Sequence, residues 1–234
     1  MRRVSIEPKD IKGPNATMKQ IVAELCKICN TRRPRRYCLG VEGGICAICC
    51  GTEREVTVSC PYECSYLRDG RDHEKKPAPG PLTHPEVEIT DNFMQRNEIL
   101  LMICTQLWWQ VSKDRAGVLD HDLIEAMTSF IQTLKTAASS GLIVSDRPEN
   151  SIAAGLLEHF TAKFVEWRAE VEKRAVAESI PGPMIRDGNV LKMMVFLERT
   201  AIALGNGRPR CRAFYHTLQG WNERLTTGPV PPPQ

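Results

Sequence analysis

Apolar residues in the C-terminal two thirds of the chain recur at spacings of three, four and seven, the period of an amphipathic helix. Five such stripes follow one another, and no alternating strand pattern of similar length separates them. The stripes are Phe93, Leu100, Cys104, Leu107 and Val111; Leu123, Met127, Phe130, Leu134 and Ala137; Ile152, Leu156, Phe160, Phe164, Trp167 and Val171; Val190, Met194, Leu197, Ala201 and Leu204; and Cys211, Phe214, Leu218, Trp221 and Leu225. The pattern predicts a mainly α fold with a five-helix bundle over residues 88–227.

Proline-rich and polar stretches predict how the rest of the chain is divided. Residues 75–87 contain four prolines, which cannot continue a helix or a central strand, and therefore form a stiff linker. Before it we expect a basic N-terminal tail over residues 1–23 and a cysteine-rich module over residues 24–74. After the bundle, residues 228–234 are rich in proline, and we expect them to be disordered.

Composition excludes several classes of protein. The chain has 234 residues, of which 42% are hydrophobic and 25% charged, so it is not a wholly disordered protein. Its longest apolar run, residues 99–104, is far shorter than the roughly 20 residues of a membrane helix. The basic pair at the N-terminus is not followed by the apolar stretch of a secretory signal. We therefore expect a cytoplasmic protein without a membrane partner.

The cysteines are the strongest chemical signal, because eight of the ten lie between residues 26 and 64. A CxxC pair can hold one tetrahedral ion through two thiolates, and two such pairs lie 16 residues apart. We predict that the first zinc ion is bound by Cys26, Cys29, Cys46 and Cys49. We predict that a second zinc ion is bound by Cys38, Cys50, Cys60 and Cys64, with His73 as a possible substitute for Cys38 or Cys50.

The module has too few large apolar residues to fold without help, so metal binding and folding should be coupled. Four thiolates also suit an iron–sulfur cluster, and the neighbouring Cys49 and Cys50 keep that alternative open. A disulfide framework suits adjacent CxxC pairs less well. A site with four cysteines leaves no open position for water, which favours a structural metal. Because the HExxH, GxSxG and Walker motifs are also absent, we do not expect an enzyme.

The cysteine run supports a resemblance to a known family. The segment reads Cys26-x2-Cys29, then Cys46-x2-Cys49-Cys50-Gly51, then Cys60-Pro61-x2-Cys64-x-Tyr66-Leu67. It resembles a bacterial family of zinc-ribbon-like proteins for which no activity is assigned, and more distantly the cross-brace zinc fingers of the B-box kind. The similarity covers about residues 24–74, with further likeness at residues 186–192 and 206–214. The resemblance implies a bacterial metal-binding module, and it implies no reaction.

Two basic segments suggest molecules that the protein could bind. Arg32, Arg33, Arg35 and Arg36 lie beside the first zinc knuckle and are candidates for contacting nucleic acid. Eight thiolates and two Zn²⁺ would, however, lower the formal net charge from +3 to −1. A glycine-rich turn precedes a second group, and its candidates for binding an anion are Arg208, Arg210 and Arg212.

These observations predict a zinc-binding protein whose metal is structural and which acts as a protein-interaction or adaptor component. The alternatives are a regulator that binds nucleic acid through residues 32–36 and an iron–sulfur redox sensor.

Overall fold

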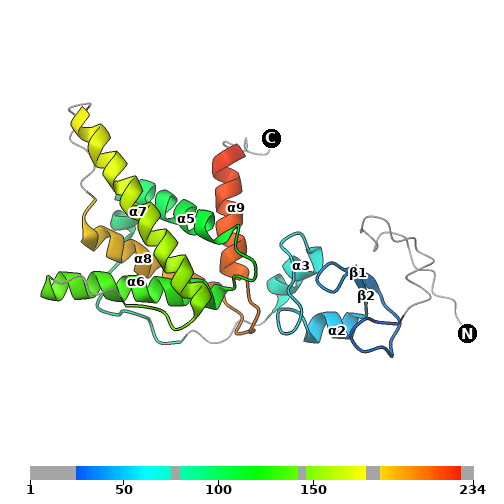
Figure 1. The fold of residues 1–234 in the computed structure, drawn as a ribbon. Coiled ribbons are helices and arrows are strands. Elements are labelled where there is room, and N and C mark those ends of the chain that lie inside the picture. Colours follow the sequence, from blue (N-terminus) through cyan, green and yellow to red (C-terminus); the bar gives the residue numbers. More distant parts are fainter. Residues whose placement is uncertain (1–24, 75–79, 142–145, 178–184, 228–234) are drawn as a thin grey trace, which may run out of the picture. The chain divides into compact units, whose positions relative to one another are not determined.

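The computed structural model describes residues 25–74, 80–141, 146–177 and 185–227 (Figure 1). The chain forms two compact units. Unit 1 contains the described residues up to 74 together with Asn206–Cys211, and unit 2 contains the other described residues. The predicted tails at residues 1–23 and 228–234, and residues 75–79 of the predicted linker, lie outside the described residues.

Unit 1 has two short strands and two helices. They are β1 (Arg36–Cys38), β2 (Gly43–Ile45), α2 (Ala47–Thr52) and α3 (Ser65–His73). The strands are antiparallel, with Arg36 opposite Ile45 and Cys38 opposite Gly43. The chain before β1 adds further backbone bonds, because Lys27 N donates to Gly44 O at 2.9 Å. A Cβ on Gly43 would lie 2.6 Å from the Lys27 side chain, so this close approach requires glycine.

The apolar core of unit 1 is small. Its buried cluster consists of Cys26, Ile45, Cys46 and Cys49, so three of its four members are cysteines. Few apolar side chains other than cysteines therefore pack around the sheet. Burial of apolar surface contributes little to the stability of this unit.

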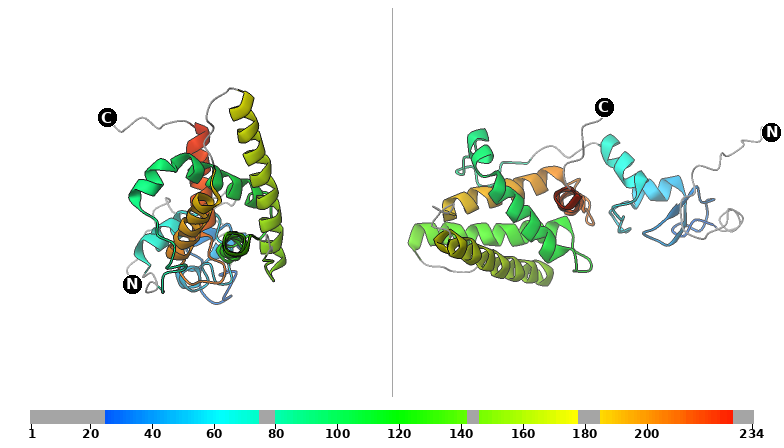
Figure 2. Two further views of the ribbon diagram at one scale, coloured as in Figure 1. Left: turned by 90° about the vertical axis from the view of Figure 1, so that its left-hand side faces the viewer. Right: turned by 90° about the horizontal axis from the view of Figure 1, so that it is seen from above.

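Unit 2 is built from helices. They are α4 (Asp91–Arg96), α5 (Glu98–Ser112), α6 (Asp120–Ser140), α7 (Ser151–Ala177), α8 (Asp187–Leu204) and α9 (Ala213–Thr227). Helix α6 packs against α7 and α8, and α5 packs against α7 and α9 (Figures 1 and 2). The core contains 25 buried residues, and at its centre Trp108 stacks on Phe160 with ring centroids 4.0 Å apart. In the part of the chain that the structure describes, no helix is long and apolar enough to cross a membrane.

The predicted mainly helical class is confirmed, since 62% of the described residues are helical, but the predicted five-helix bundle is not. The first apolar stripe is divided between α4 and α5 at Asn97, whose φ of −118° and ψ of 24° are not helical. The Asn97 side chain donates to the carbonyl of Phe93 at 2.8 Å. The backbone N–H of Asn97 donates to the same carbonyl at 3.1 Å, so both bonds tie Asn97 to the last turn of α4.

Residues 80–87, the described part of the predicted linker, are held against the helices of unit 2. The Arg199 guanidinium donates to the backbone carbonyls of Thr83, His84 and Val87 at 2.8–3.2 Å. The His84 ring places Nε2 3.2 Å from a carboxylate oxygen of the buried Glu198. This stretch is therefore fixed by polar contacts rather than by regular secondary structure.

Candidate metal centre

The candidate metal centre is assembled from two knuckles that flank the small sheet of unit 1. Cys26 and Cys29 lie in the turn before β1, where Asn30 has a φ of +50° and donates its N–H to Cys26 O. Cys46 is the N-cap of α2, and Cys49 lies in the first turn of that helix. The antiparallel strands bring the ends of the two knuckles together, although 16 residues separate them in the sequence.

The four sulfur atoms of Cys26, Cys29, Cys46 and Cys49 lie within 4.8 Å of one another. Three of these cysteines are buried and Cys29 is partly buried. A tetrahedral ion with metal–sulfur bonds of about 2.3 Å places its ligands roughly 3.8 Å apart, so only small movements are needed to close this group around an ion. The four cysteines can therefore hold a metal ion.

Backbone amides already point at the sulfurs. Cys46 N lies 3.3 Å from Cys26 Sγ, and Cys49 N lies 3.4 Å from Cys46 Sγ. Such N–H groups stabilise negative charge on sulfur, so the local backbone is arranged for thiolates rather than for neutral thiols.

The electrostatics of the four thiols differ from one another. The hydroxyl of Thr31 donates to Cys29 and, together with nearby backbone N–H groups, lowers the pKa of Cys29 to about 5. The backbone N–H of Cys49 lowers the pKa of Cys46, whereas burial raises the pKa of Cys49 to about 12. The Arg32 side chain donates to Cys46, and this contact raises the pKa of the guanidinium. Arg32 thus offsets part of the negative charge that four thiolates would bring.

The other arginines of the basic loop have different surroundings. The Arg36 guanidinium lies over the ring of Tyr66, 3.8 Å from its centroid, which is the geometry of a cation–π contact. Arg33 and Arg35 are exposed. Arg32 and Arg36 thus have partners inside unit 1, namely Cys46 and Tyr66. The loop's predicted contact with nucleic acid stays a prediction.

The remaining ligand candidates, Cys38, Cys50, Cys60 and Cys64, are all partly buried and lie on four different parts of unit 1. Cys38 ends β1, Cys50 lies in α2, Cys60 lies in the loop after it, and Cys64 is the N-cap of α3. Among the residues described, only the first four cysteines form a group of three or more ligands at metal-binding distance. The substitute ligand His73 is exposed in the last turn of α3.

The second group nevertheless shares one electrostatic environment. Burial raises the pKa of Cys38, and neighbouring Cys50 and Cys64 add to that rise. Burial likewise raises the pKa of Cys60 to about 11, again with contributions from Cys64 and Cys38. A metal ion would therefore have to displace the proton of Cys60 at neutral pH.

The arginines predicted to bind an anion belong to different environments. Arg208 forms an ion pair with Glu74 at 2.5 Å, and Arg210 donates to the Ser59 hydroxyl at 2.8 Å, both within unit 1. Arg212 lies in unit 2, where its guanidinium stacks over an aromatic ring. The three side chains therefore have separate protein partners, and their predicted binding of an anion stays a prediction.

Sequence reasoning missed the importance of Glu55, which is completely buried. Its carboxylate accepts hydrogen bonds from Arg71 at 2.5 Å and from Asn206 at 2.9 Å. No signal in the sequence identifies this cluster, because its two partners lie 16 and 151 positions away.

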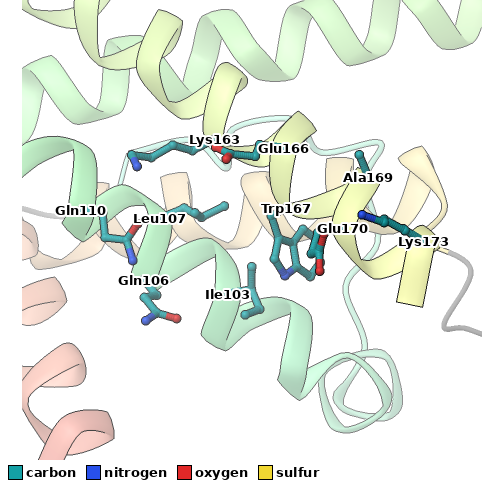
Figure 3. Close-up of a pocket in the computed structure, with 10 residues that line it drawn as sticks. All are labelled: Ile103, Gln106, Leu107, Gln110, Lys163, Glu166, Trp167, Ala169, Glu170 and Lys173. Carbon is teal, nitrogen blue, oxygen red and sulfur yellow. The ribbon is translucent and has the colours of Figure 1, made fainter. Parts of the chain in front are cut away.

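Unit 2 contains a separate surface feature, a groove of about 660 Å³ between α5 and α7 (Figure 3). Its apolar floor is formed by Ile103, Leu107 and Trp167, and charged side chains of α7 lie along its edge. The remaining residues that line it are Gln106, Gln110, Lys163, Glu166, Ala169, Glu170 and Lys173.

Comparison with protein-family models, with curated proteins and with solved structures gave no match to this chain. The likeness to the bacterial zinc-ribbon-like family thus rests on the cysteine pattern alone. The structure shows one part of that pattern, the clustering of Cys26, Cys29, Cys46 and Cys49.

Proposed function

We propose that unit 1 is a zinc-binding module in which the metal holds the fold together, and that the protein acts as an interaction or adaptor component. The observation that carries the proposal is the group of four thiols within 4.8 Å. A set of four sulfur ligands with tetrahedral geometry is typical of zinc or of an iron–sulfur cluster. With all four positions occupied by protein, a zinc ion has no site for water or substrate, so its role is structural.

We also propose a second zinc ion between Cys38, Cys50, Cys60 and Cys64. Two observations on unit 1 support it. A Cβ on Gly40 would lie 2.7 Å from Ser59 O, so the turn after Cys38 lies directly against the residue before Cys60. In α2, Cys49 and Cys50 are adjacent, so their side chains leave the helix in different directions and can serve two ions. Four thiols on four segments then form a cross-linked set around the second ion.

Elemental analysis of the purified full chain tests the proposal. We expect about two zinc ions per chain, and loss of the fold of unit 1 when a strong chelator removes them. A protein that contains no zinc, or that keeps the same structure in chelator, would contradict it. Iron and acid-labile sulfide with visible absorption after anaerobic purification would instead identify an iron–sulfur protein.

We propose that the partner is a protein, and the groove between α5 and α7 supports this choice. An apolar floor bordered by charges suits a partner helix that presents apolar residues flanked by complementary charges. Nucleic acid is less well supported, because Arg32 and Arg36 already have partners within unit 1.

Charge reversal in the groove separates the two partner classes. If a protein binds there, Lys173→Glu should abolish its capture by the full chain, while the matched change Lys113→Glu, on an exposed residue outside the groove, should not. If nucleic acid is the partner, binding should fall steeply with salt and depend on Arg33 and Arg35 instead. Capture that neither groove charge nor salt affects would contradict both assignments.

A further inference from the structure

The segment Asn206–Cys211 belongs to unit 1, although it is more than 130 residues away from the rest of that unit in the sequence. The chain leaves α8 at Leu204, passes through unit 1 and begins α9 at Ala213. Within the segment, the Asn206 side chain accepts the N–H of Arg208 at 3.0 Å, and Gly207 has a φ of +74°. The turn is therefore shaped by its own residues before it makes any contact with the cysteine-bearing part.

Glu55 is the centre of the contact between this segment and the cysteine-bearing part. It is fully buried and has a φ of +53°, a conformation that non-glycine residues rarely adopt. Asn206 Nδ2 donates to one of its carboxylate oxygens and Arg71 to the other. Arg210 N donates to the Glu55 carbonyl at 2.8 Å. A buried carboxylate with an unusual backbone conformation persists only when its surroundings fix it, and two of the contacts that do so come from the 206–211 segment.

Arg208 extends the contact to the neighbours of the second group of cysteines. Its guanidinium pairs with Glu74, just after α3, at 2.5 Å. It also donates to the backbone carbonyls of Gly51 and Arg54, at 3.2 and 2.5 Å. Gly51 directly follows Cys50, and Glu74 ends the helix α3 that begins after Cys64. The Arg208 side chain therefore connects the residue after Cys50 to the helix after Cys64.

One further contact places the segment beside another ligand candidate, and a contact within the cysteine-bearing part connects the helix after Cys64 to it. Arg210 donates to the hydroxyl of Ser59, the residue before Cys60. Gly70 lies on α3, and a Cβ at this position would be 1.3 Å from the guanidinium of Arg54. Helix α3 is therefore packed closely on the loop between Cys50 and Cys60. The 206–211 segment thus contacts the backbone or side chain next to Cys50, next to Cys60 and at the end of the helix that Cys64 begins.

We infer that the 206–211 segment is a positioning part of the second metal site, because it bonds beside Cys50, beside Cys60 and at the end of the helix that follows Cys64, and so fixes the three segments that carry these ligands. The inference rests on the second zinc ion proposed above. Residues that orient ligands without binding the metal change its affinity by about 10-fold to 100-fold when they are removed. The first site is held differently, because the backbone N–H of Cys46 donates to Cys26 Sγ and joins its two knuckles directly.

The rate of zinc release from the full chain, followed with a colorimetric chelator, tests this inference. Asn206→Ala and Arg208→Ala should release one ion about 10-fold to 100-fold faster than the wild type, with the other ion unchanged. Cys60→Ser, which removes a ligand, shows how the loss of the second ion appears in the same assay. Arg224→Ala, on an exposed residue of α9, is the matched control and should behave as the wild type.

Two results would separate the failure of this inference from the failure of the proposed function. If the wild type holds two ions and both segment variants release them at the wild-type rate, the segment has no positioning role and the metal sites stand. If the wild type holds fewer than two ions, the second site itself is wrong. Helical circular dichroism, which unit 2 dominates, shows whether a variant has unfolded as a whole. Asn206→Asp keeps the size of the side chain, places a carboxylate against Glu55 and Glu74, and should give the same rapid release.

Discussion

The two units of this protein are stabilised in different ways, and the difference is visible in what each one buries. Unit 2 buries 25 apolar residues around stacked aromatic rings, which is the ordinary basis of a stable helical domain. Unit 1 buries a cluster of four residues, three of which are cysteines, and outside that cluster it buries Val58, Leu67, Cys211 and the charged Glu55. In unit 1 three of the four residues of this cluster also belong to the group of four thiols that could hold a metal ion. The metal binding proposed above would therefore make the stability and the chemistry of unit 1 one property, whereas the core of unit 2 contains no such group among its described residues.

This comparison predicts that a single thiol matters far more in unit 1 than in unit 2. Cys49→Ala should remove a large part of the roughly 10–16 kcal/mol that a structural zinc ion contributes, because water must replace one of the four thiolates that close the site. The matched substitution Cys104→Ala removes a buried thiol from the core of unit 2 and should leave the zinc content unchanged. Elemental analysis of both variants is the measurement. Equal zinc in Cys49→Ala and the wild type would show that this cysteine is not a ligand.

A substitution that creates a cavity in the core of unit 2 should lower the stability of unit 2 and leave the zinc content unchanged. Phe160 is fully buried and stacks on Trp108, so Phe160→Ala should lower the free energy of unfolding of unit 2 by about 3–5 kcal/mol. Urea unfolding followed by helical circular dichroism gives the change, and the zinc content should remain that of the wild type. Loss of zinc in this variant would mean that the two units are not stabilised independently.

Per pH unit, the smallest effect is that of pH on metal binding, which acts on unit 1 alone. The pKa of Cys49 is raised to about 12, so zinc must displace its proton at any pH near neutrality, and zinc binding weakens as the pH falls. Each displaced proton changes the affinity about 10-fold per pH unit. The pKa of Cys29 is lowered to about 5, so this thiol adds to the loss of affinity only as the pH falls through about 5. Equilibrium dialysis between pH 8 and pH 4 measures the slope, and an affinity that does not change with pH would contradict thiolate ligation.

Local patterns made much of this architecture predictable. Spacings of three and four predict the mainly helical unit 2, because they follow from the 3.6-residue turn. The two CxxC pairs predict the group that clusters, because each knuckle is a local structure of four residues. The division at Asn97 is also local, but it consists of the non-helical backbone conformation of one polar residue, which an apolar pattern does not reveal.

The rest depends on contacts between distant residues. Glu55 and Asn206 are 151 positions apart, and neither shows in the sequence that it will be buried with the other. For the same reason the sequence places Arg208 between two helices of the bundle and suggests an anion as its ligand. In the structure Arg208 pairs with Glu74, a carboxylate of the protein itself.

Hydrogen exchange of the full chain, followed by mass spectrometry with and without a strong chelator, tests most directly the claim that metal holds unit 1 together. Our account predicts that amide protection over residues 26–73 and 206–211 is lost in chelator, while the helices α5 to α9 keep theirs. Unchanged protection of residues 26–73 after complete removal of the metal would contradict it.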